Sequence, residues 1–354
     1  MTTIPMTYAR GMGPLPRLLK EREGTVAVKR IFAAEAVPLA LVDDRNHRIP
    51  LRSLAALFER GARAAGDPRF GFDVGLHMPT EDYGLWMQYA FQADSLGDTI
   101  SRVASTLAFH QSGSVMRIAP RTGGQCALEY WHANVKLPAF QQHSDGLVPG
   151  MISLAQFFLG PAWRPSRVEV GYPAPETRSY LEDATGTPWL FDQPALAIVF
   201  PSEALLARKP QASGLPPRRL LSLKDVETSA NTAISVTPSG QIREVISLRL
   251  LDGLTDIEGA AALLDISCRT LQRLLDREGL NYRSLLNHVR MDRAYRLINE
   301  TNAPIKRISS ELGYGHPAHF TRAFSAQFGC PPSFFRTRNQ TMCTARGTET
   351  AQRP

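Results

Sequence analysis

Two copies of a helix-turn-helix pattern lie in tandem over residues 256–338, and the pattern of one long helix joins them. The helix that ends the first copy contains Cys268-Arg269-Thr270-Leu271-Gln272-Arg273, and its counterpart in the second contains Ala318-His319-Phe320-Thr321-Arg322-Ala323-Phe324. In both helices Leu or Phe recurs on one side, and Thr and Arg occupy the other. Such a motif places its second helix in the major groove of DNA. This stretch therefore predicts an all-α domain that binds duplex DNA.

Positive charge is concentrated in the same stretch. Residues 266–340 contain 12 Lys+Arg and 5 Asp+Glu, a net of +7, and the whole chain contains 40 and 33, which is also +7. The rest of the chain therefore holds 28 residues of each sign and is neutral as a group. A localised basic face favours contact with phosphates more than an evenly basic chain does. The alternative is a solvated basic helix face.

The whole chain has the composition of a globular protein that lacks membrane segments. Its 354 residues suffice for two or three domains, and 43% are hydrophobic. The N-terminus has no signal-peptide pattern, and apolar runs such as Met151–Leu159 are too short to span a bilayer. A cytoplasmic location without a membrane partner is therefore expected. The scattered cysteines show no metal spacing, which favours reduced thiols, no metal and no cofactor over a redox or metal sensor. They are Cys126, Cys268, Cys330 and Cys343.

Capping residues and glycines mark the helices of the predicted DNA-binding domain, residues 241–338. Ser267 suits the N-cap of the first recognition helix, and Gly279 suits its end. The joining helix would be roughly 27 Å long at about 1.5 Å per residue, which approaches the ~34 Å between successive major-groove faces. The helix-turn-helix units are expected at 257–278 and 305–328. The expected helices are 240–252, 257–264, 268–278, 282–299, 305–312 and 317–328.

Five strings in this region occur in a recognisable order. They are Ser-x-Arg-Thr-Leu-Gln-Arg (267–273), Arg-x-x-x-Ala-x-x-Leu (290–297), Ile-x-x-Ile-Ser-x-x-Leu-Gly-Tyr (305–314), Phe-Thr-Arg-Ala-Phe (320–324) and Gly-Cys-Pro-Pro-Ser-x-x-Arg (329–336). Together they resemble the DNA-binding domain of the AraC/XylS family of transcription regulators. One departure is Asp265, where the first turn usually carries Gly; Asp tolerates the left-handed region better than most residues.

The side chains of the two recognition helices suggest unequal roles. Arg269 and Arg273 suit guanine and Gln272 suits adenine, and phosphate contacts or surface ion pairs are the alternatives. The second unit begins with His316-Pro317-Ala318, where relatives often have polar residues, and Ala318 can touch only a thymine methyl. Sequence specificity is therefore expected mainly from the first unit. The predicted DNA-contacting residues are Arg269, Thr270, Gln272, Arg273, Arg277, His319, Thr321 and Arg322.

Residues 1–206 predict an α+β domain, and a linker follows over 207–240. Prolines mark both ends of the linker, and a short helix is expected at 220–230 between them. Residues 339–354 are expected to form a tail. The helices expected in the first domain are 51–64, 94–109 and 147–159, and the expected strands are 115–118, 126–132, 167–171 and 195–200.

Further strings in this domain carry a second resemblance. They are Gly84-Leu85, Ser95-Leu96-Gly97-Asp98-Thr99-Ile100, Leu159-Gly160-Pro161-x-Trp163-x-Pro165-x-x-Val168, Pro173-x-Pro175 and Ala197-Ile198-Val199-Phe200-Pro201. They resemble the ligand-binding domain of one branch of the AraC/XylS family, which has an α/β sensor in place of a cupin-like barrel. The resemblance implies an effector site and a dimerisation role for residues 1–206. Relatives often have His where this chain has Tyr172.

Aromatic residues of the first domain are candidates for an effector pocket. Ordinary core packing is the alternative for each of them. The chain has no P-loop, no Gly-x-Ser-x-Gly, no His-Glu-x-x-His and no Gly-x-Gly-x-x-Gly after a strand, so no catalytic residues and no enzyme activity are expected. The candidate pocket residues are Trp86, Tyr89, Tyr130, Trp131 and His132.

The leading hypothesis is a ligand-responsive, DNA-binding transcription regulator. The resemblance implies an activator that acts on RNA polymerase, and a homodimer. One alternative is an architectural DNA-binding protein without a ligand. Another is a DNA-modifying enzyme with the same DNA-binding domain, as in alkyl-transfer repair proteins. That enzyme would need a cysteine cluster in the first domain, where only Cys126 lies.

Overall fold

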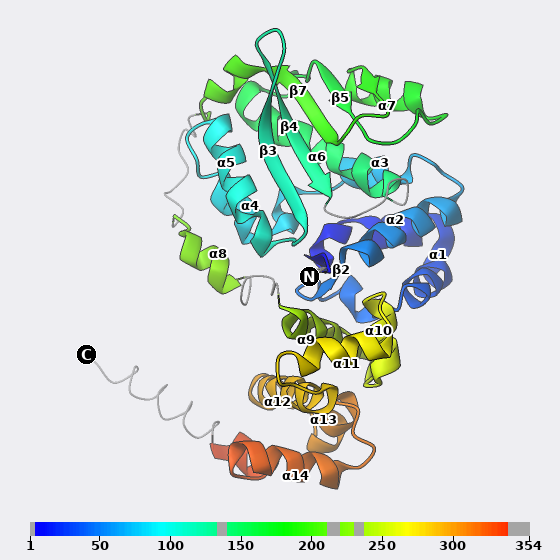
Figure 1. The fold of residues 1–354 in the computed structure, drawn as a ribbon, viewed down its shortest axis with the longest axis vertical. Coiled ribbons are helices and arrows are strands. Elements are labelled where there is room, and N and C mark those ends of the chain that lie inside the picture. Colours follow the sequence, from blue (N-terminus) through cyan, green and yellow to red (C-terminus); the bar gives the residue numbers. More distant parts are fainter. Residues whose placement is uncertain (1–3, 133–139, 211–219, 230–236, 339–354) are drawn as a thin grey trace, which may run out of the picture. The chain divides into compact units, whose positions relative to one another are not determined.

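The chain forms two compact units, residues 1–236 and 237–354, which are described separately here (Figure 1). The computed structural model describes residues 4–132, 140–210, 220–229 and 237–338. The first unit mixes helices with two sheets, and the second is helical. The predicted α+β domain followed by an all-α domain is therefore confirmed. Each helix in the described ranges is too short or too polar to cross a lipid bilayer.

The main sheet of the first unit has five strands in the order β3-β4-β7-β5-β6. All neighbours are antiparallel except β5 and β6. The four expected strands are present, and the two-residue β6 was not expected. A separate pair, β1 (Met6–Tyr8) and β2 (Arg48–Pro50), is also antiparallel. The strands of the main sheet are β3 (Ser114–Arg121), β4 (Gln125–His132), β5 (Arg167–Glu169), β6 (Trp189–Leu190) and β7 (Leu196–Pro201).

Eight helices occur in the described part of this unit. Those expected at 51–64 and 94–109 are present as α2 and α5, whereas α6 begins at Gln141 instead of Leu147, and α1, α3, α4 and α7 were not expected. They are α1 (Leu15–Ala34), α2 (Leu51–Ala65), α3 (Phe70–Leu76), α4 (Leu85–Ala90), α5 (Leu96–Thr106), α6 (Gln141–Leu159), α7 (Arg178–Thr185) and α8 (Leu223–Ser229).

Helix α6 lies between one face of the sheet and helix α3. Its Val148 and Ile152 are buried in one cluster with Leu128 and Ile198 of the strands. On the α3 side the backbones nearly touch, because a Cβ atom added to Gly71 would lie 2.0 Å from the carbonyl oxygen of Gln142. Glycine is therefore required at this crossing, which fixes the N-terminal half of α6 in the core.

Helix α8 packs on the first unit, although the sequence places it in the linker. Val226 is 2% exposed and belongs to the main core cluster. The backbone N–H of Leu221 donates to Oε1 of Gln92 at 2.9 Å. Residues 207–240 were predicted as a linker, but Val226 gives this short helix an apolar inner side. The helix therefore packs on the first unit.

The second unit contains six α-helices in its described part, and they match the six helices that the sequence predicts. Pro238, expected in the linker, instead opens α9 at a first-turn position where a missing N–H costs little. Leu271, Leu275, Phe320 and Phe324 are fully buried, as their helical spacing predicts. The helices are α9 (Pro238–Arg249), α10 (Ile257–Leu263), α11 (Cys268–Asp276), α12 (Tyr282–Glu300), α13 (Ile305–Glu311) and α14 (Pro317–Phe328).

Candidate nucleic-acid interface and effector cavity

The first recognition helix, α11, is held at its start by a side-chain cap. The Ser267 hydroxyl accepts a hydrogen bond from the Thr270 backbone N–H at 3.1 Å. The turn before it passes through Asp265 at φ 58°, so the expected left-handed Asp is confirmed. Leu271 and Leu275 are buried and fix the rotation of the helix about its axis. The opposite side of the helix therefore faces solvent.

That solvent-facing side carries the predicted DNA-contacting groups. Arg269, Gln272, Arg273 and Arg277 are all exposed. Their side chains make no ion pair or hydrogen bond with any residue that the structure describes. The Thr270 hydroxyl lies 2.9 Å from Oγ of Ser267, so it belongs to the cap. A row of unpaired guanidinium groups with one amide can bond phosphates and base edges in a major groove.

The second recognition helix, α14, presents fewer such groups. Pro317 opens it, and its N-cap residue His316 makes no side-chain cap bond. His319 and Arg322 are exposed, and Thr321 is half-buried. The exposed side of α14 therefore offers one imidazole and one guanidinium, against three guanidiniums and an amide on α11 and its C-cap residue.

Arg290 of the long helix α12 has a structural role. Its Nε donates to the Leu312 carbonyl and its Nη2 to the Gly313 carbonyl, both at 2.8 Å. The guanidinium lies 4.4 Å from the centroid of the Tyr314 ring. Burial lowers the pKa of this arginine from its ordinary value. Arg290 thus ties the joining helix to the turn of the second helix-turn-helix unit.

A second arginine, the buried Arg249, fixes the start of the first helix-turn-helix unit. Arg249 donates to the Asp256 carboxylate at 2.8 Å, and the same carboxylate accepts the Gly259 N–H at 2.7 Å to cap α10. The Arg249 guanidinium lowers the pKa of Asp256. A Cβ atom on Gly259 would lie 2.0 Å from this guanidinium, so a larger residue there would displace the Arg249 side chain from its present position.

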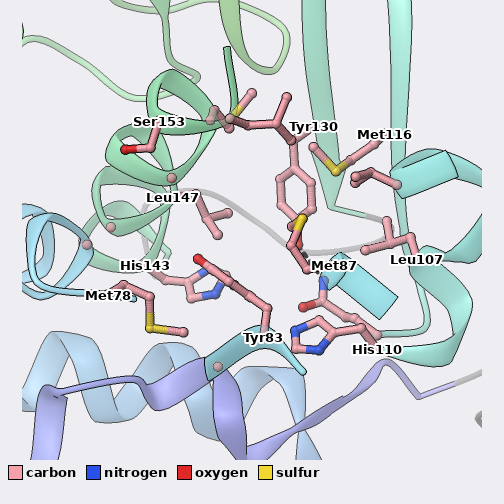
Figure 2. A pocket seen from close by; sticks show the side chains of 18 of the residues that line it. Met78, Tyr83, Met87, Leu107, His110, Met116, Tyr130, His143, Leu147 and Ser153 are labelled. Carbon is pink, nitrogen blue, oxygen red and sulfur yellow. Dashed lines mark hydrogen bonds between the residues drawn. The ribbon is translucent and has the colours of Figure 1, made fainter. Parts of the chain in front are cut away.

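In the first unit, a cavity lies between helices α2, α3, α4 and α6 and the β3–β4 hairpin (Figure 2). The centre of a water molecule can reach about 140 Å³ of it. Its surface is mostly aliphatic, aromatic and thioether. The lining residues include Phe58, Met78, Tyr83, Trp86, Met87, His110, Met116, Tyr130, His143, Leu147 and Met151.

The structure separates the five predicted pocket residues. Trp86 and Tyr130 line the cavity. His132 packs behind it, with its ring centroid 4.7 Å from that of Tyr130. Tyr89 lies beneath the Arg102 guanidinium, 4.9 Å from ring centroid to Cζ. Trp131 is on the other face of the sheet, because side chains alternate along β4.

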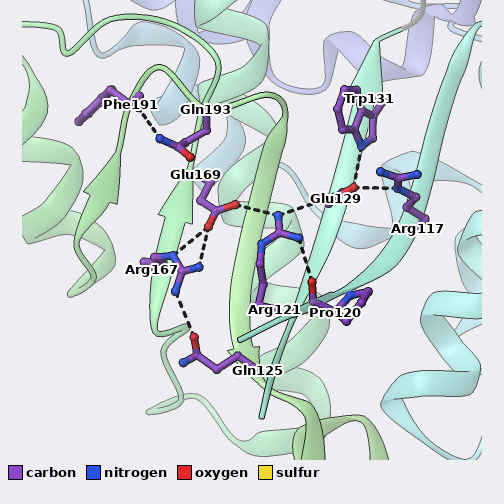
Figure 3. A network of polar contacts seen from close by, with 10 residues as sticks. All are labelled: Arg117, Pro120, Arg121, Gln125, Glu129, Trp131, Arg167, Glu169, Phe191 and Gln193. Atoms are coloured by element: carbon purple, nitrogen blue, oxygen red, sulfur yellow. Dashed lines mark hydrogen bonds and ion pairs between the residues drawn. The ribbon is translucent and has the colours of Figure 1, made fainter. Parts of the chain in front are cut away.

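Trp131 belongs to a polar network on that opposite face (Figure 3). Its Nε1 donates to Glu129 at 2.8 Å. The Arg121 Nη2 bridges Glu129 and Glu169, at 2.9 Å to each carboxylate. Ala197 stands between these two acids in the register of the strands, and its small side chain leaves room for the guanidinium above it. The network therefore covers the sheet on the side away from the cavity.

Several polar atoms in the cavity wall have no hydrogen-bond partner within the described ranges. They are Nε1 of Trp86, Nδ1 of His110 and Nδ1 of His143. Burial lowers the pKa of both histidines to about 3, so both rings are neutral at physiological pH. Burial also raises the pKa of Tyr83 to about 12. Unpaired buried polar atoms are costly in an empty protein, which makes them candidates to bind a ligand.

His110, His143 and Tyr83 were not predicted from the sequence. His143 begins a stripe on α6 that continues through Leu147, Met151 and Leu154, all of which line the cavity. This helical spacing is visible in the sequence once α6 is known to begin at Gln141. No comparable local pattern marks His110, which follows the short turn after α5.

Tyr172, the departure noted in the sequence, does not line the cavity. It is buried and its hydroxyl donates a short hydrogen bond to the Asp145 carboxyl of α6. Burial raises the pKa of Asp145 to about 7. Across the described parts of the chain, no three His, Cys, Asp or Glu side chains are grouped to hold a metal ion.

Comparison with known proteins agrees with this two-part arrangement. A family model described as the arabinose-binding N-terminal domain of AraC transcription regulators matches residues 26–209, and a helix-turn-helix model matches residues 260–338. The first match covers more than half of the chain.

For several known proteins the similarity extends over most of this chain. The ornithine utilization regulator of Pseudomonas aeruginosa is 25% identical over 340 residues, which cover 94% of this chain and 96% of the relative. The regulator VqsM of the same species is 24% identical over 277 residues, 75% of this chain and 83% of the relative. The crystal structure of the regulator CdpR from Pseudomonas aeruginosa covers 88% of this chain and 97% of its own, at 20% identity and a TM-score of 0.41.

The matched families and relatives are transcription regulators and not enzymes. The matched models account for the sensor-type unit and for the helix-turn-helix unit in the order that the sequence predicts. The chain belongs to the AraC/XylS family of transcription regulators, in the branch whose N-terminal domain is α/β.

Proposed function

We propose that this transcription regulator is controlled by a small-molecule effector that binds in the cavity of its first unit. The main support for this proposal is a set of buried nitrogens without hydrogen-bond partners, on Trp86, His110 and His143, in the wall of one apolar cavity. A core that only had to be stable would leave few such atoms unpaired. A ligand that bonds them would stabilise the bound state.

We propose that DNA is bound chiefly by α11. Its exposed Arg269, Gln272 and Arg273 are the proposed contacts with base edges, and the exposed Arg277 is the proposed contact with a phosphate. The Thr270 hydroxyl already bonds Ser267, so it offers DNA only its remaining hydrogen-bonding capacity. In α14 the proposed contacts are His319, Thr321 and Arg322. Specificity then comes mainly from the half of the site that α11 contacts.

The proposal extends to an activator that works in the cytoplasm as a homodimer and contacts RNA polymerase. The urease operon transcriptional activator of Escherichia coli is 33% identical over 84 residues, and its name supports activation over repression in this proposal. Those residues cover only 24% of this chain, so the support concerns the DNA-binding unit. An effector would act by binding two states of the regulator with different affinity.

The test measures DNA affinity and transcription with and without metabolites. DNA sites are first selected from random sequence with the full-length protein, and a reporter is placed behind the selected site. L-ornithine is included because of the name of the relative. We expect at least one metabolite to change promoter affinity or reporter output severalfold. If no compound of any charge changes either quantity, the proposed effector control is wrong.

A further inference from the structure

We infer that the effector is a small, uncharged aromatic molecule with one or two hydrogen-bonding atoms. This inference rests on the proposed function and narrows the chemistry of its ligand. The observations behind it are the absence of charge in the described cavity wall, the size and apolar character of the cavity, and the unpaired nitrogens at one end of it.

The cavity offers no counter-charge to an ion. Among the described residues that line it there is no Asp, Glu, Lys or Arg. Its two histidines are neutral, because burial lowers their pKa to about 3. Moving a carboxylate or an ammonium from water into such a site costs several kcal/mol unless a partner pairs with it. Organic acids, amines and amino acids are therefore poor ligands.

The size and surface of the cavity fit a single ring. A dry protein cavity of ~150 Å³ accepts benzene, and this one offers about 140 Å³. Phe58, Tyr83 and Trp86 supply aromatic faces and edges, against which a ring packs at favourable geometry. Met78, Met87, Met116 and Met151 add sulfur atoms, which also contact aromatic rings favourably and adapt to irregular shapes.

The polar end of the ligand is set by the unpaired nitrogens. His143, Tyr83 and His110 lie together at the lower end of the cavity in Figure 2, and Met116 and Tyr130 lie above them. Nε1 of Trp86 is a donor only, so it needs an acceptor on the ligand. Nδ1 of His143 can donate or accept according to its tautomer. A hydroxyl or an amide on the ring can donate and accept, so it suits either nitrogen, and a carbonyl suits the Trp86 donor.

Three probes of similar size separate charge from shape. Benzamide is neutral, benzoate is an anion and benzylamine is a cation at pH 7.5. Binding to the full-length protein is measured by calorimetry and by the shift in melting temperature. We expect benzamide to bind at least about tenfold more tightly than either ion, because the ions lose their hydration without a partner. Equal or tighter binding of an ion in the cavity overturns the inference, as does a failure of benzamide to bind.

Two variants place the binding in the cavity. Leu147→Trp puts a ring into the space and is expected to abolish benzamide binding. Leu190→Trp, the same change at an exposed position of β6, is expected to leave it unchanged. His143→Leu removes an unpaired buried nitrogen, so the free protein is expected to stay as stable as the wild type. Benzamide is then expected to bind about tenfold more weakly, whereas toluene, which cannot bond His143, is expected to bind unchanged.

The outcomes distinguish the inference from the proposed function. If an ionic metabolite binds in the cavity and changes promoter affinity, effector control stands and the uncharged ligand class is wrong. If Leu147→Trp leaves benzamide binding intact, the site lies elsewhere and the inference fails. If benzamide binds in the cavity but no compound changes DNA binding or transcription, the ligand class stands for this site and the regulatory role fails.

Discussion

The indole of Trp86 stacks on the imidazole of His110, with ring centroids 5.0 Å apart and 20° between the ring planes. Both residues line the effector cavity, and both also line a smaller crevice with Val226 and Ser229 of helix α8. The stacked pair is therefore the partition between the cavity and α8. Helix α8 is the last described element before the DNA-binding unit. If a ligand displaces this pair, we therefore expect the packing of α8 to change.

Val226→Ala is expected to weaken the coupling between ligand and DNA. The change removes buried methyl groups that hold α8 on the first unit and costs about 1–3 kcal/mol of stability. Ligand affinity, measured by calorimetry, is expected to stay within about threefold of the wild type. The ratio of promoter affinities with and without ligand is expected to fall towards one. Val115→Ala, at an exposed position of β3, serves as the control, and an unchanged ratio in Val226→Ala would contradict this role for α8.

The helices of the second unit could be predicted almost residue by residue because their signals are local. Caps such as Ser267 and Asp256, and glycines such as Gly279, lie within a few residues of the ends that they determine. Helix α1 was missed for a physical reason. Gly24 has φ 80° and ψ 171° inside it, so the chain turns there and its two halves do not share one apolar stripe.

The effector cavity was harder to predict because its wall comes from distant segments. Only Trp86 and Tyr130 of the predicted set line it. The start of α6 contains Gln142, His143, Ser144 and Asp145, which are polar in sequence yet buried in the fold. Their burial depends on the backbone contact with Gly71, which joins residues 71 positions apart and leaves no local pattern.

Arg273→Ala is expected to cost about 1–3 kcal/mol of binding free energy on the selected DNA site and to relax base preference at one position. The reason is the unpaired guanidinium in the middle of the exposed side of α11, where it can donate two hydrogen bonds to guanine. Affinity is measured on the selected site and on single-base variants over a series of salt concentrations. A uniform loss with a shallower salt dependence would instead assign Arg273 to a phosphate. Arg17→Ala, in the first unit, is the control for general charge effects.

Arg290→Met is expected to destabilise the second helix-turn-helix unit by about 2–3 kcal/mol. The Met side chain fills similar space but leaves the Leu312 and Gly313 carbonyls without their charged donor. Chemical denaturation followed by helical circular dichroism measures the loss. Arg283→Met changes an exposed arginine of the same helix and is expected to shift stability by less than about 0.5 kcal/mol. Equal effects of the two changes would show that the contacts of Arg290 with the turn contribute little.

Asp145→Asn is expected to change how stability depends on pH. In the folded protein burial raises the pKa of Asp145 to about 7, from an ordinary value of 3.8. Between these values the folded state holds a proton that the unfolded chain releases, so the wild type loses stability as the pH rises through this window. Asparagine does not titrate and still offers an oxygen to the Tyr172 hydroxyl. The free energy of unfolding of the variant, relative to the wild type, is therefore expected to rise by roughly 2–4 kcal/mol from pH 4.5 to pH 7.5.

The buried histidines change the pH dependence of stability in the direction opposite to Asp145. Their contribution cancels when the variant is compared with the wild type. The pKa of His110 and of His143 is lowered by burial to about 3, so both stabilise the fold above their ordinary pKa of 6.5 and lose that contribution as the pH falls. Both proteins contain them, so the difference between variant and wild type isolates Asp145. Asp183→Asn, at an exposed acid of α7, is the control for the loss of one carboxyl group. A difference between Asp145→Asn and the wild type that does not vary with pH would mean that Asp145 titrates alike in the folded and unfolded chain, and that its bond to Tyr172 offsets its burial.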